Sequence, residues 1–300
     1  MAKITEVVYE GYEAVEISNQ NLSLWVTVSA GPRILGLSAF KEDNLLAVLP
    51  GAELDYPGEG SLKLIGGHRL WYAPEIPERT YIPDGNPVAW NPVDGGIELI
   101  QPVEQSTGVQ KRILIEIDPT AARVTLTHTL SNQGNEPIEL APWAITQVRP
   151  GGVGVLPLET ANADPHGLLP NREVVLWPYT QIQSEHLSLT DPAIFVHSTM
   201  SEGALKVGVS NPRGWIAYAL AGQLFVKRSP YVAGGSYLDR GASSQIYCCK
   251  DFLELETLSP LVQLQPGEET SHIEYWEVYA DGKWPAEIAD LILPGMGTPG

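Results

Sequence analysis

Alternation of apolar and polar residues recurs along most of this chain and limits its fold more than any other feature. Ala14–Ser18 and Leu22–Val28 alternate on either side of Asn19–Asn21, which has turn chemistry. Arg112–Ile117 and Arg123–Leu130 repeat the pattern, and Phe252–Thr257 and His272–Tyr279 are expected to form the last pair of strands, joined through Pro266–Glu269. A period of two places every second side chain on one face of a β-strand, and short polar connections join antiparallel neighbours. The sequence therefore predicts antiparallel strands in series.

Helices are expected to be rare because 29 Gly and 25 Pro are spread along the chain and would interrupt them. The best candidate is the short segment Pro285–Leu293. Asp55–Gly96 and Asn162–Tyr179 lack alternation, are rich in proline and aromatic residues, and are expected to be long loops that build a site above a sheet. We therefore expect one all-β domain over residues 1–300, with a core of about residues 10–282 and a short C-terminal tail.

Charge and cysteine content exclude several classes of partner. The formal net charge of −18 repels phosphate backbones and anionic lipids, so we expect neither a nucleic-acid nor a membrane partner. The two cysteines, Cys248 and Cys249, are adjacent, and no Cys/His spacing matches a zinc site, so we expect no metal, no cofactor and a reducing, cytoplasmic location. The start of the chain has no apolar targeting core. The oligomeric state is open.

Two stretches resemble the same known family. Gly66–Glu75 reads Gly-Gly-His-Arg-Leu-Trp-Tyr-Ala-Pro-Glu, and Phe252–Pro260 reads Phe-Leu-Glu-Leu-Glu-Thr-Leu-Ser-Pro. Together with Pro142–Val148 and Phe225–Arg228, they resemble an uncharacterised bacterial family allied to galactose mutarotase, or aldose 1-epimerase. The resemblance spans roughly Ile17–Tyr279. It implies a galactose-mutarotase-like β-supersandwich, in which two large antiparallel sheets form a carbohydrate site on a concave face.

The resemblance also implies roles for single residues. In mutarotases a glutamate on a late strand acts as base at the anomeric hydroxyl, and its motif is similar to that around Glu256. Arg69 and His68 resemble the arginine and histidine that hold the sugar, although their order differs. Where a mutarotase has its mid-chain histidine acid, this chain has Trp143, followed by Gln147. Tryptophan cannot donate a proton as an acid, so the usual catalytic pair is incomplete.

Glu254 and Glu256 are the strongest candidates from the residues alone. They stand two apart in an apolar strand, so both side chains point to one face. Two carboxylates on one face need water, cations or a ligand. Their mutual repulsion raises one pKa toward the range of a general base. A solvated outer face is the alternative interpretation.

Further candidates surround this pair. His68 and Arg69 follow two glycines, which let a backbone approach a ligand, and Arg69 offers a planar fork of donors. A structural ion pair of Arg69 with Glu75 or with a strand glutamate is the alternative. Glu75 and Gln147 are also expected to contact the ligand. Lys227 ends a strand and is expected at a pocket rim, or else on the surface. The aromatic side chains expected to stack on a sugar ring are Trp71, Trp143, Tyr231 and Tyr237.

Three functions stay open from the sequence. The first is an isomerase of the aldose 1-epimerase type, with Glu256 or Glu254 as base and His68 as acid. The second is a carbohydrate-binding protein without chemistry, which the presence of Trp143 favours. The third, a glycoside hydrolase or lyase, fits poorly because carboxyl groups from one strand rarely flank a glycosidic bond from both sides. A small-molecule carbohydrate is the expected ligand in the first two.

Overall fold

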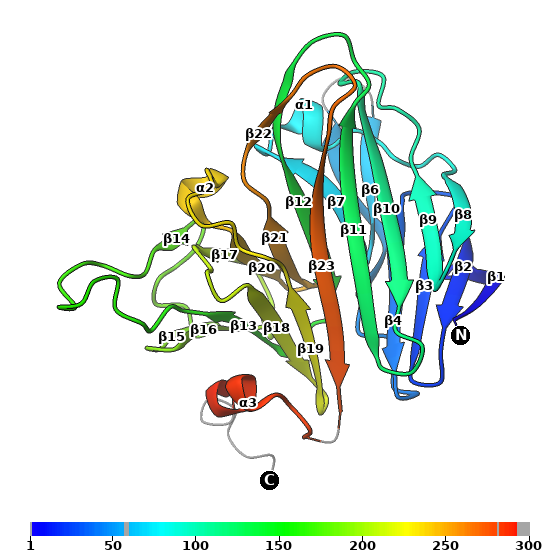
Figure 1. Ribbon diagram of the computed structural model, residues 1–300. Coiled ribbons are helices and arrows are strands. Elements are labelled where there is room, and N and C mark those ends of the chain that lie inside the picture. Colours follow the sequence, from blue (N-terminus) through cyan, green and yellow to red (C-terminus); the bar gives the residue numbers. More distant parts are fainter. Residues whose placement is uncertain (1, 57–59, 281, 293–300) are drawn as a thin grey trace.

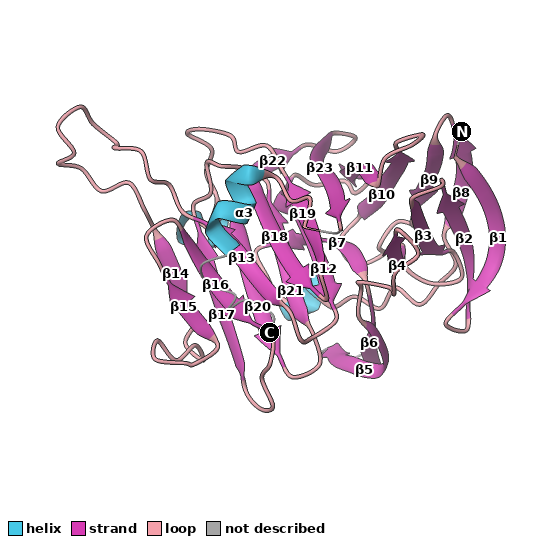
Figure 2. Ribbon diagram, turned by 90° about the horizontal axis from the view of Figure 1, so that it is seen from below, coloured by secondary structure: helices cyan, strands magenta, loops and turns pink. Residues whose placement is uncertain are grey.

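Two large antiparallel β-sheets make up most of the chain. The computed structural model describes residues 2–56, 60–280 and 282–292. Sheet I has eleven strands in the described part of the chain, and sheet II has ten. The strands of sheet II lie in front of those of sheet I in Figure 1, and Figure 2 shows the same sheets from below.

The order of the strands mixes early and late parts of the chain. Sheet I runs β1 (Lys3–Tyr9), β2 (Tyr12–Ser18), β3 (Leu22–Thr27), β4 (Arg33–Ala39), β7 (His68–Ala73), β12 (Ile138–Val148), β21 (Leu253–Leu258), β20 (Ser244–Cys249), β17 (Ala204–Val209) and β14 (Val174–Leu176), with β22 (Val262–Leu264) paired to β12. Sheet II runs β15 (Leu187–Leu189), β16 (Ala193–His197), β13 (Val153–Pro157), β18 (Trp215–Leu220), β19 (Gln223–Arg228), β23 (Glu269–Tyr279), β11 (Arg123–Asn132), β10 (Val109–Ile117), β9 (Gly96–Ile100) and β8 (Ala89–Val93). A separate hairpin joins β5 (Val48–Tyr56) to β6 (Gly60–Gly66).

The alternating segments form the predicted strands. β2 pairs with β3 across the Asn19–Asn21 turn, and β10 pairs with β11. Burial in β10 alternates at every residue, because one face packs on the core between the sheets and the other faces outward. Helices are short: α1 (Pro77–Thr80), α2 (Leu238–Gly241) and α3 (Ala286–Ile292). The helix expected at the C-terminal end is therefore confirmed up to Ile292, and Leu293 lies outside the described residues.

Three predictions about strands were wrong. Asp55–Gly96 was expected to be a long loop, but it contains β6, β7 and β8, and Asn162–Tyr179, also expected to be a loop, contains the short strand β14. All six residues of β7 are buried, because sheet II covers one face of this central strand and other segments cover the other, so the alternation is lost. The late strands β21 and β23 were expected to pair with each other. They instead lie in different sheets, β21 between β12 and β20 and β23 between β19 and β11.

A continuous apolar core fills the space between the sheets. It includes Ile17, Leu37, Ile115, Leu126 and Phe225, all fully buried. No helix in the described ranges is long and apolar enough to cross a lipid bilayer. The face of sheet I that points away from sheet II carries a smaller apolar cluster, which includes Trp71, Trp143 and Ile145.

Candidate functional site

Five neighbouring strands of sheet I bring the polar side chains together. The register sets Ile145 of β12 opposite both Arg69 of β7 and Glu256 of β21. Two residues further along β12, on the same face, Gln147 lies opposite Glu254. Residues directly opposite each other in antiparallel strands project to the same face. Arg69 and the two glutamates, 185 or more positions later in the sequence, therefore share one face of the sheet.

The same face extends across the next two strands. Tyr247 of β20 lies opposite Glu254, and Lys206 of β17 lies opposite Tyr247. On the other side, Trp143 of β12 is in register with Trp71 of β7. The row therefore places aromatic rings on both sides of the charged groups.

A hollow of about 540 Å³ opens above this face. Its floor includes Arg69, Trp71, Trp143, Lys206 and Glu254. Its walls come from three other segments: the β5–β6 hairpin, the segment that follows β7, and the segment that follows β14. This hollow, built by parts of the chain far apart in sequence, is the candidate functional site.

Glu256 lies directly behind the floor of the hollow and is fully buried. Its Oε2 accepts hydrogen bonds from Lys206 Nζ and Trp143 Nε1, each at 2.8 Å. Its Oε1 has no hydrogen-bond partner among the described residues. Burial raises the pKa of Glu256 to about 7, and the charge of Glu254 adds to the effect, while Lys206 opposes it. This carboxyl group therefore exchanges its proton near neutral pH.

Glu254 faces the hollow itself, with 14% of its side chain exposed. Its Oε1 accepts hydrogen bonds from Gln147 Nε2 at 2.8 Å and from Arg69 Nη2 at 3.4 Å. Burial raises the pKa of Glu254 above its ordinary value, although the cations of Arg69 and Lys206 oppose the shift. Glu254 is thus the carboxylate that a ligand would meet first.

Both cations of the site lie against indole rings. The Arg69 guanidinium lies 4.5 Å from the centre of the Trp71 ring. Lys206 Nζ lies 4.9 Å from the Trp143 ring and 4.8 Å from that of Trp177. Burial lowers the pKa of Arg69 to about 10, and Arg69 Nε and Nη1 have no partner in the described part of the chain. Both cations are therefore fixed in place, and Arg69 keeps unused donors.

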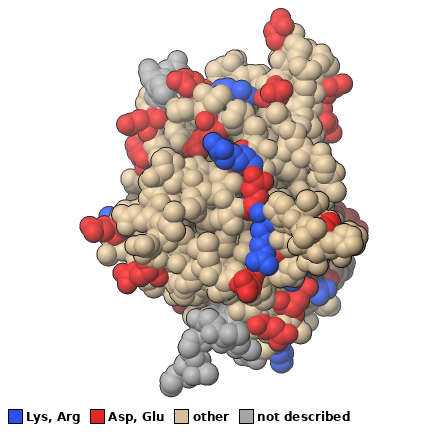
Figure 3. Space-filling model, turned by 90° about the vertical axis from the view of Figure 1, so that its left-hand side faces the viewer, with Lys and Arg blue, Asp and Glu red and all other residues tan. Residues whose placement is uncertain are grey.

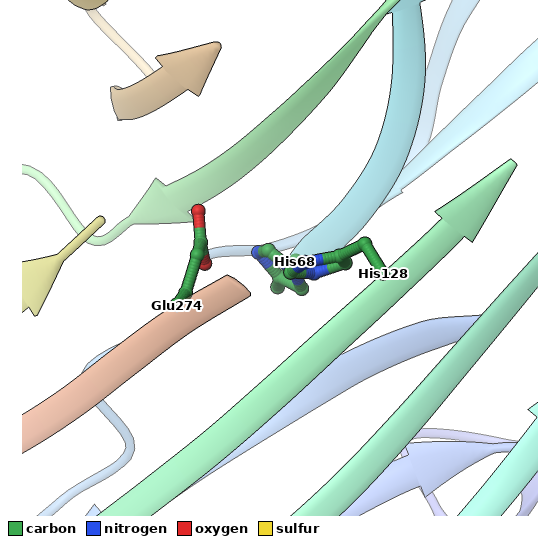
Figure 4. Close-up of side chains that lie close together, drawn as sticks. All are labelled: His68, His128 and Glu274. Atoms are coloured by element: carbon green, nitrogen blue, oxygen red, sulfur yellow. The ribbon is translucent and has the colours of Figure 1, made fainter. Parts of the chain in front are cut away.

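His68 is not part of this hollow, which corrects the expectation that it supplies the acid. Neighbouring side chains of a strand point to opposite faces, so His68 points between the sheets while Arg69 points into the hollow. His68 Nδ1 lies 2.9 Å from Thr146 Oγ1, and its Nε2 lies 2.7 Å from His128 Nε2. Figure 4 shows His68 beside His128, with Glu274 close by.

The prediction for Lys227 was also wrong. It was expected at a pocket rim but is fully buried between the sheets. Its Nζ contacts Glu274 Oε1 at 2.9 Å and donates to the carbonyl oxygens of Leu255 and Ala144. It lies two residues after buried Phe225 on β19, so both side chains point to the same face of the strand, toward the core. Lys227 therefore belongs to the core.

The buried group of His68, His128 and Glu274 has the spacing of a metal site, because its ligand atoms lie within 4.8 Å of one another. Hydrogen bonds already account for these atoms. Glu274 Oε1 accepts from Lys227 and Thr257, and Oε2 accepts from Trp276. The nearby ammonium group also repels a cation. The group is a closed polar network within the core.

A single set of donors satisfies the histidines of that network. Lys227 Nζ lies 3.1 Å from Thr146 Oγ1, the fourth oxygen around its three N–H groups, and the Thr146 hydroxyl donates to His68 Nδ1. His68 Nε2–H then donates to His128 Nε2, and His128 Nδ1–H donates to the carbonyl oxygen of His272. This assignment needs neutral imidazoles, and burial lowers the pKa of His128 to about 4.

The remaining candidates divide between the hollow and its surroundings. Glu75 lies on the wall of the hollow and accepts a 2.6 Å hydrogen bond from Tyr81 Oη. Tyr231 stacks on Tyr237, with ring centres 5.2 Å apart, and neither lines the hollow. Of the predicted residues, the hollow therefore gathers Glu254, Arg69, Trp71, Glu75 and Trp143 at its surface, with Glu256 and Gln147 directly behind.

Sequence reasoning missed several residues of the hollow. Lys206 alternates with buried apolar residues in β17, where a strand lysine reads as an ordinary surface charge. Trp177 and Tyr179 follow the short strand β14 in a segment without a periodic pattern. The one available signal was composition, since Trp and Tyr number 20 against four Phe.

No protein-family model matches the chain, and no curated protein matches it significantly. Solved structures do. A TPR-domain protein from Parabacteroides distasonis aligns with a TM-score of 0.57 and 14% identity, over 92% of this chain and 49% of that protein, so the chain spans about half its length. A candidate aldose 1-epimerase from Klebsiella pneumoniae aligns with a TM-score of 0.57 and 11% identity, over 98% of this chain and 88% of that protein. A galactose mutarotase-like protein from Clostridium acetobutylicum aligns with a TM-score of 0.52 and 10% identity, over 93% of this chain and 99% of that protein. The expected galactose-mutarotase-like fold is confirmed.

Proposed function

We propose that the hollow binds a carbohydrate. The observation that carries this proposal is the mixture of hydrogen-bond donors and acceptors beside aromatic rings at the surface of the hollow. Arg69 and Lys206 line the hollow and offer N–H donors, while Glu254, with 14% of its side chain exposed, offers carboxylate acceptors. A sugar hydroxyl both donates and accepts a hydrogen bond, so a polyhydroxylated ring suits both kinds of group. The indole rings of Trp71 and Trp143, 5.5 Å apart, offer apolar surface to the C–H faces of the ring.

Charge favours a neutral sugar over an anionic one. The two cations, Arg69 and Lys206, each lie against a glutamate, and Glu75 adds a further carboxylate at the wall. Figure 3 shows acidic side chains around a short central band in which basic and acidic side chains alternate. With a net charge of −18, the protein repels anions at long range as well. Sugar phosphates and uronic acids are therefore poor candidates.

Binding to a panel of neutral sugars tests the proposal. Tyr179 and Tyr275 are nearly equally exposed, at 46% and 44%, but only Tyr179 lines the hollow. We expect calorimetry to detect binding of at least one of the methyl pyranosides of glucose, galactose, mannose and xylose. Tyr179→Ala should weaken it severalfold, and Tyr275→Ala should leave it unchanged. Absence of binding by these methyl glycosides and by the phenyl glycosides of the same sugars, or equal losses in both variants, would contradict the proposal.

Isomerisation at the anomeric carbon is a second candidate function, favoured by the pKa of Glu256 near 7. Glu254 takes the proton of the anomeric hydroxyl as the ring C–O bond breaks, and Lys206, paired with Glu256, donates a proton to the ring oxygen. Both atoms are attached to one carbon, so groups on one side of the sugar can reach them. The open-chain aldehyde then rotates about its C1–C2 bond, and the reverse proton transfers close the ring as the other anomer. The glycosidase or lyase alternative, which also rests on Glu254 and Glu256, requires carboxyl groups on both sides of the bond.

Exchange of anomers separates this function from binding alone. For each methyl pyranoside that binds, the exchange rate between the α and β forms of the corresponding free sugar, which carries the anomeric hydroxyl, is measured by magnetisation-transfer NMR, with and without the protein. Catalysis predicts a faster exchange that Glu254→Gln reduces at least tenfold. Binding without acceleration would leave the carbohydrate-binding function and remove the isomerase.

A further inference from the structure

The lining of the hollow changes from charged to apolar next to β21. Glu254, with Arg69 and Lys206, forms the polar end, and Phe252, two residues earlier in the chain, forms the apolar end with Leu64. Leu64 and Phe252 belong to one buried apolar cluster, on which the ring of Tyr247 packs, and Leu54 packs both on this cluster and on that of Trp71 and Trp143. A ligand that fills the hollow therefore meets polar groups at one end and aliphatic and aromatic carbon at the other.

The β5–β6 hairpin produces the apolar end by its register. Leu54 of β5 lies opposite Leu62 of β6, so the two share a face, and Leu64 shares it because it follows two positions later. The other face carries Glu53, Lys63 and Asp55. Leu62 and Leu64 are 1% and 8% exposed, whereas Lys63 between them is exposed. The hairpin thus turns its leucines toward the hollow and its charges toward solvent.

An unsubstituted hexose does not suit the apolar end. It carries hydroxyl groups around most of its ring, and a hydroxyl pressed against leucine and phenylalanine loses its hydrogen bonds to water without replacement. Such a loss costs about 1–3 kcal/mol for each group. The volume of about 540 Å³ is also in the range of pockets for ligands larger than one small ring. The apolar end therefore suits an apolar part of the ligand.

We propose that the ligand is a sugar with an apolar aryl or alkyl substituent, which packs on Leu54, Leu64 and Phe252 while the sugar ring lies over the charged floor. This inference rests on the proposed carbohydrate function and narrows it to a substrate class. Burial of the substituent away from water adds binding free energy that depends little on direction, and hydrogen bonds at the polar end orient the sugar ring.

Matched glycosides test the inference. The probes are the phenyl and methyl pyranosides of glucose, galactose, mannose and xylose, in both anomers, with phenol alone as a further probe, and binding is measured by calorimetry. At least one phenyl glycoside should bind about tenfold or more tightly than its methyl counterpart, because the ring buries apolar area. Phenol alone should bind more weakly than that glycoside by at least tenfold.

Variants of the hairpin locate the substituent. Leu64→Ser and Leu54→Ser should each reduce the advantage of phenyl over methyl at least threefold. Lys63→Ser, on the same strand but the outer face, should leave that advantage unchanged. Leu54 is only half-buried, so its variant keeps the test valid even where Leu64→Ser fails to fold.

Each negative result has its own meaning. If neither phenyl nor methyl glycosides bind, the carbohydrate function itself is contradicted. If methyl glycosides bind as tightly as phenyl glycosides, the proposal of an apolar substituent is overturned and the proposed carbohydrate function stands. If phenol binds as tightly as the glycosides, or the leucine variants retain the full phenyl advantage, the proposed arrangement of sugar and substituent is wrong.

Discussion

The two sides of sheet I each contain a buried lysine–glutamate pair, and the two pairs have opposite properties. On the side of the hollow, Lys206 Nζ lies 2.8 Å from Glu256 Oε2. On the side of sheet II, Lys227 Nζ lies 2.9 Å from Glu274 Oε1. All four side chains are at least 95% buried. Distance and burial alone therefore do not distinguish them.

Their surroundings do. Burial by itself raises the pKa of either glutamate, but for Glu274 the charge of Lys227 and the hydrogen bond of His272 reverse the shift, and its pKa lies well below the ordinary value. Glu256 has a like-charged neighbour in Glu254, and its pKa rises to about 7. The inter-sheet pair belongs to a network whose hydrogen bonds are complete, whereas Arg69, Gln147 and Glu256 beside the hollow keep buried atoms without a partner among the described residues. A complete buried network rigidifies the core, and unpaired buried polar groups are costly.

Removal of each lysine should give the largest difference between the two sides. Lys227→Met leaves Glu274 buried without its cation, and we expect a loss of about 3–5 kcal/mol in the free energy of unfolding. Lys206→Met should cost less, about 1–2 kcal/mol, because Glu256 can take up a proton near neutral pH. Urea unfolding at pH 7 measures both, and a variant too unstable to fold counts as a large loss. Equal losses would show that the pairs are equivalent.

The second largest effect is expected in the pH dependence of the free energy of unfolding, to which Glu256 contributes. The pKa of Glu256 rises from 4.5 in the unfolded chain to about 7 in the folded one, so the folded protein holds the proton more tightly. Its contribution to the free energy of unfolding is therefore complete below pH 4.5 and is lost as the pH rises through 7, by about 3 kcal/mol. Glu256→Gln should remove this fall.

The buried histidines act in the opposite direction. The pKa values of His68 and His128 are lowered, mainly by burial, so their contribution is present above their unfolded value of 6.5 and is lost as the pH falls. They affect the parent protein and the Glu256→Gln variant equally. Urea unfolding of both proteins from pH 4 to 8 therefore isolates Glu256 as the difference. A difference that does not vary with pH would place the pKa of Glu256 at its ordinary value.

Short-range patterns predicted the strands and the shared face of the two glutamates, whereas the arrangement of two stacked sheets was predicted from the family resemblance. Alternation at Arg112–Ile117 predicted a strand, and the spacing of Glu254 and Glu256 placed them on one face, as the structure has them. The same rule, applied to His68 and Arg69, separates neighbours in a strand. Gly66 and Gly67 suggest a turn at this point of the sequence, and the buried strand β7 has no alternation that would indicate a strand instead.

The rest of the site depends on contacts between distant segments. Lys206 meets Glu256 because β17 and β21 both pair with β20, a placement that the local pattern of neither strand predicts. Lys227 enters the core because β23 lies beside β19 and supplies Glu274. In a chain without an alignment, a lysine that will be buried beside a carboxylate is indistinguishable from one on the surface.

The smallest expected effects come from two neighbours on β12, which compare the two sides of the sheet most directly. Thr146 Oγ1 contacts His68 and Lys227 in the core, whereas Gln147 Nε2 donates to Glu254 at the hollow. Thr146→Val should lower the free energy of unfolding by about 1–2 kcal/mol and leave binding of the tightest panel glycoside unchanged. Gln147→Met should weaken that binding about three- to tenfold, because Glu254 loses a partner that fixes its orientation. Urea unfolding and calorimetry on both variants give the four values. Loss of binding in Thr146→Val would mean that the core network reaches the ligand through β12, and the two faces would then have to be treated as one site.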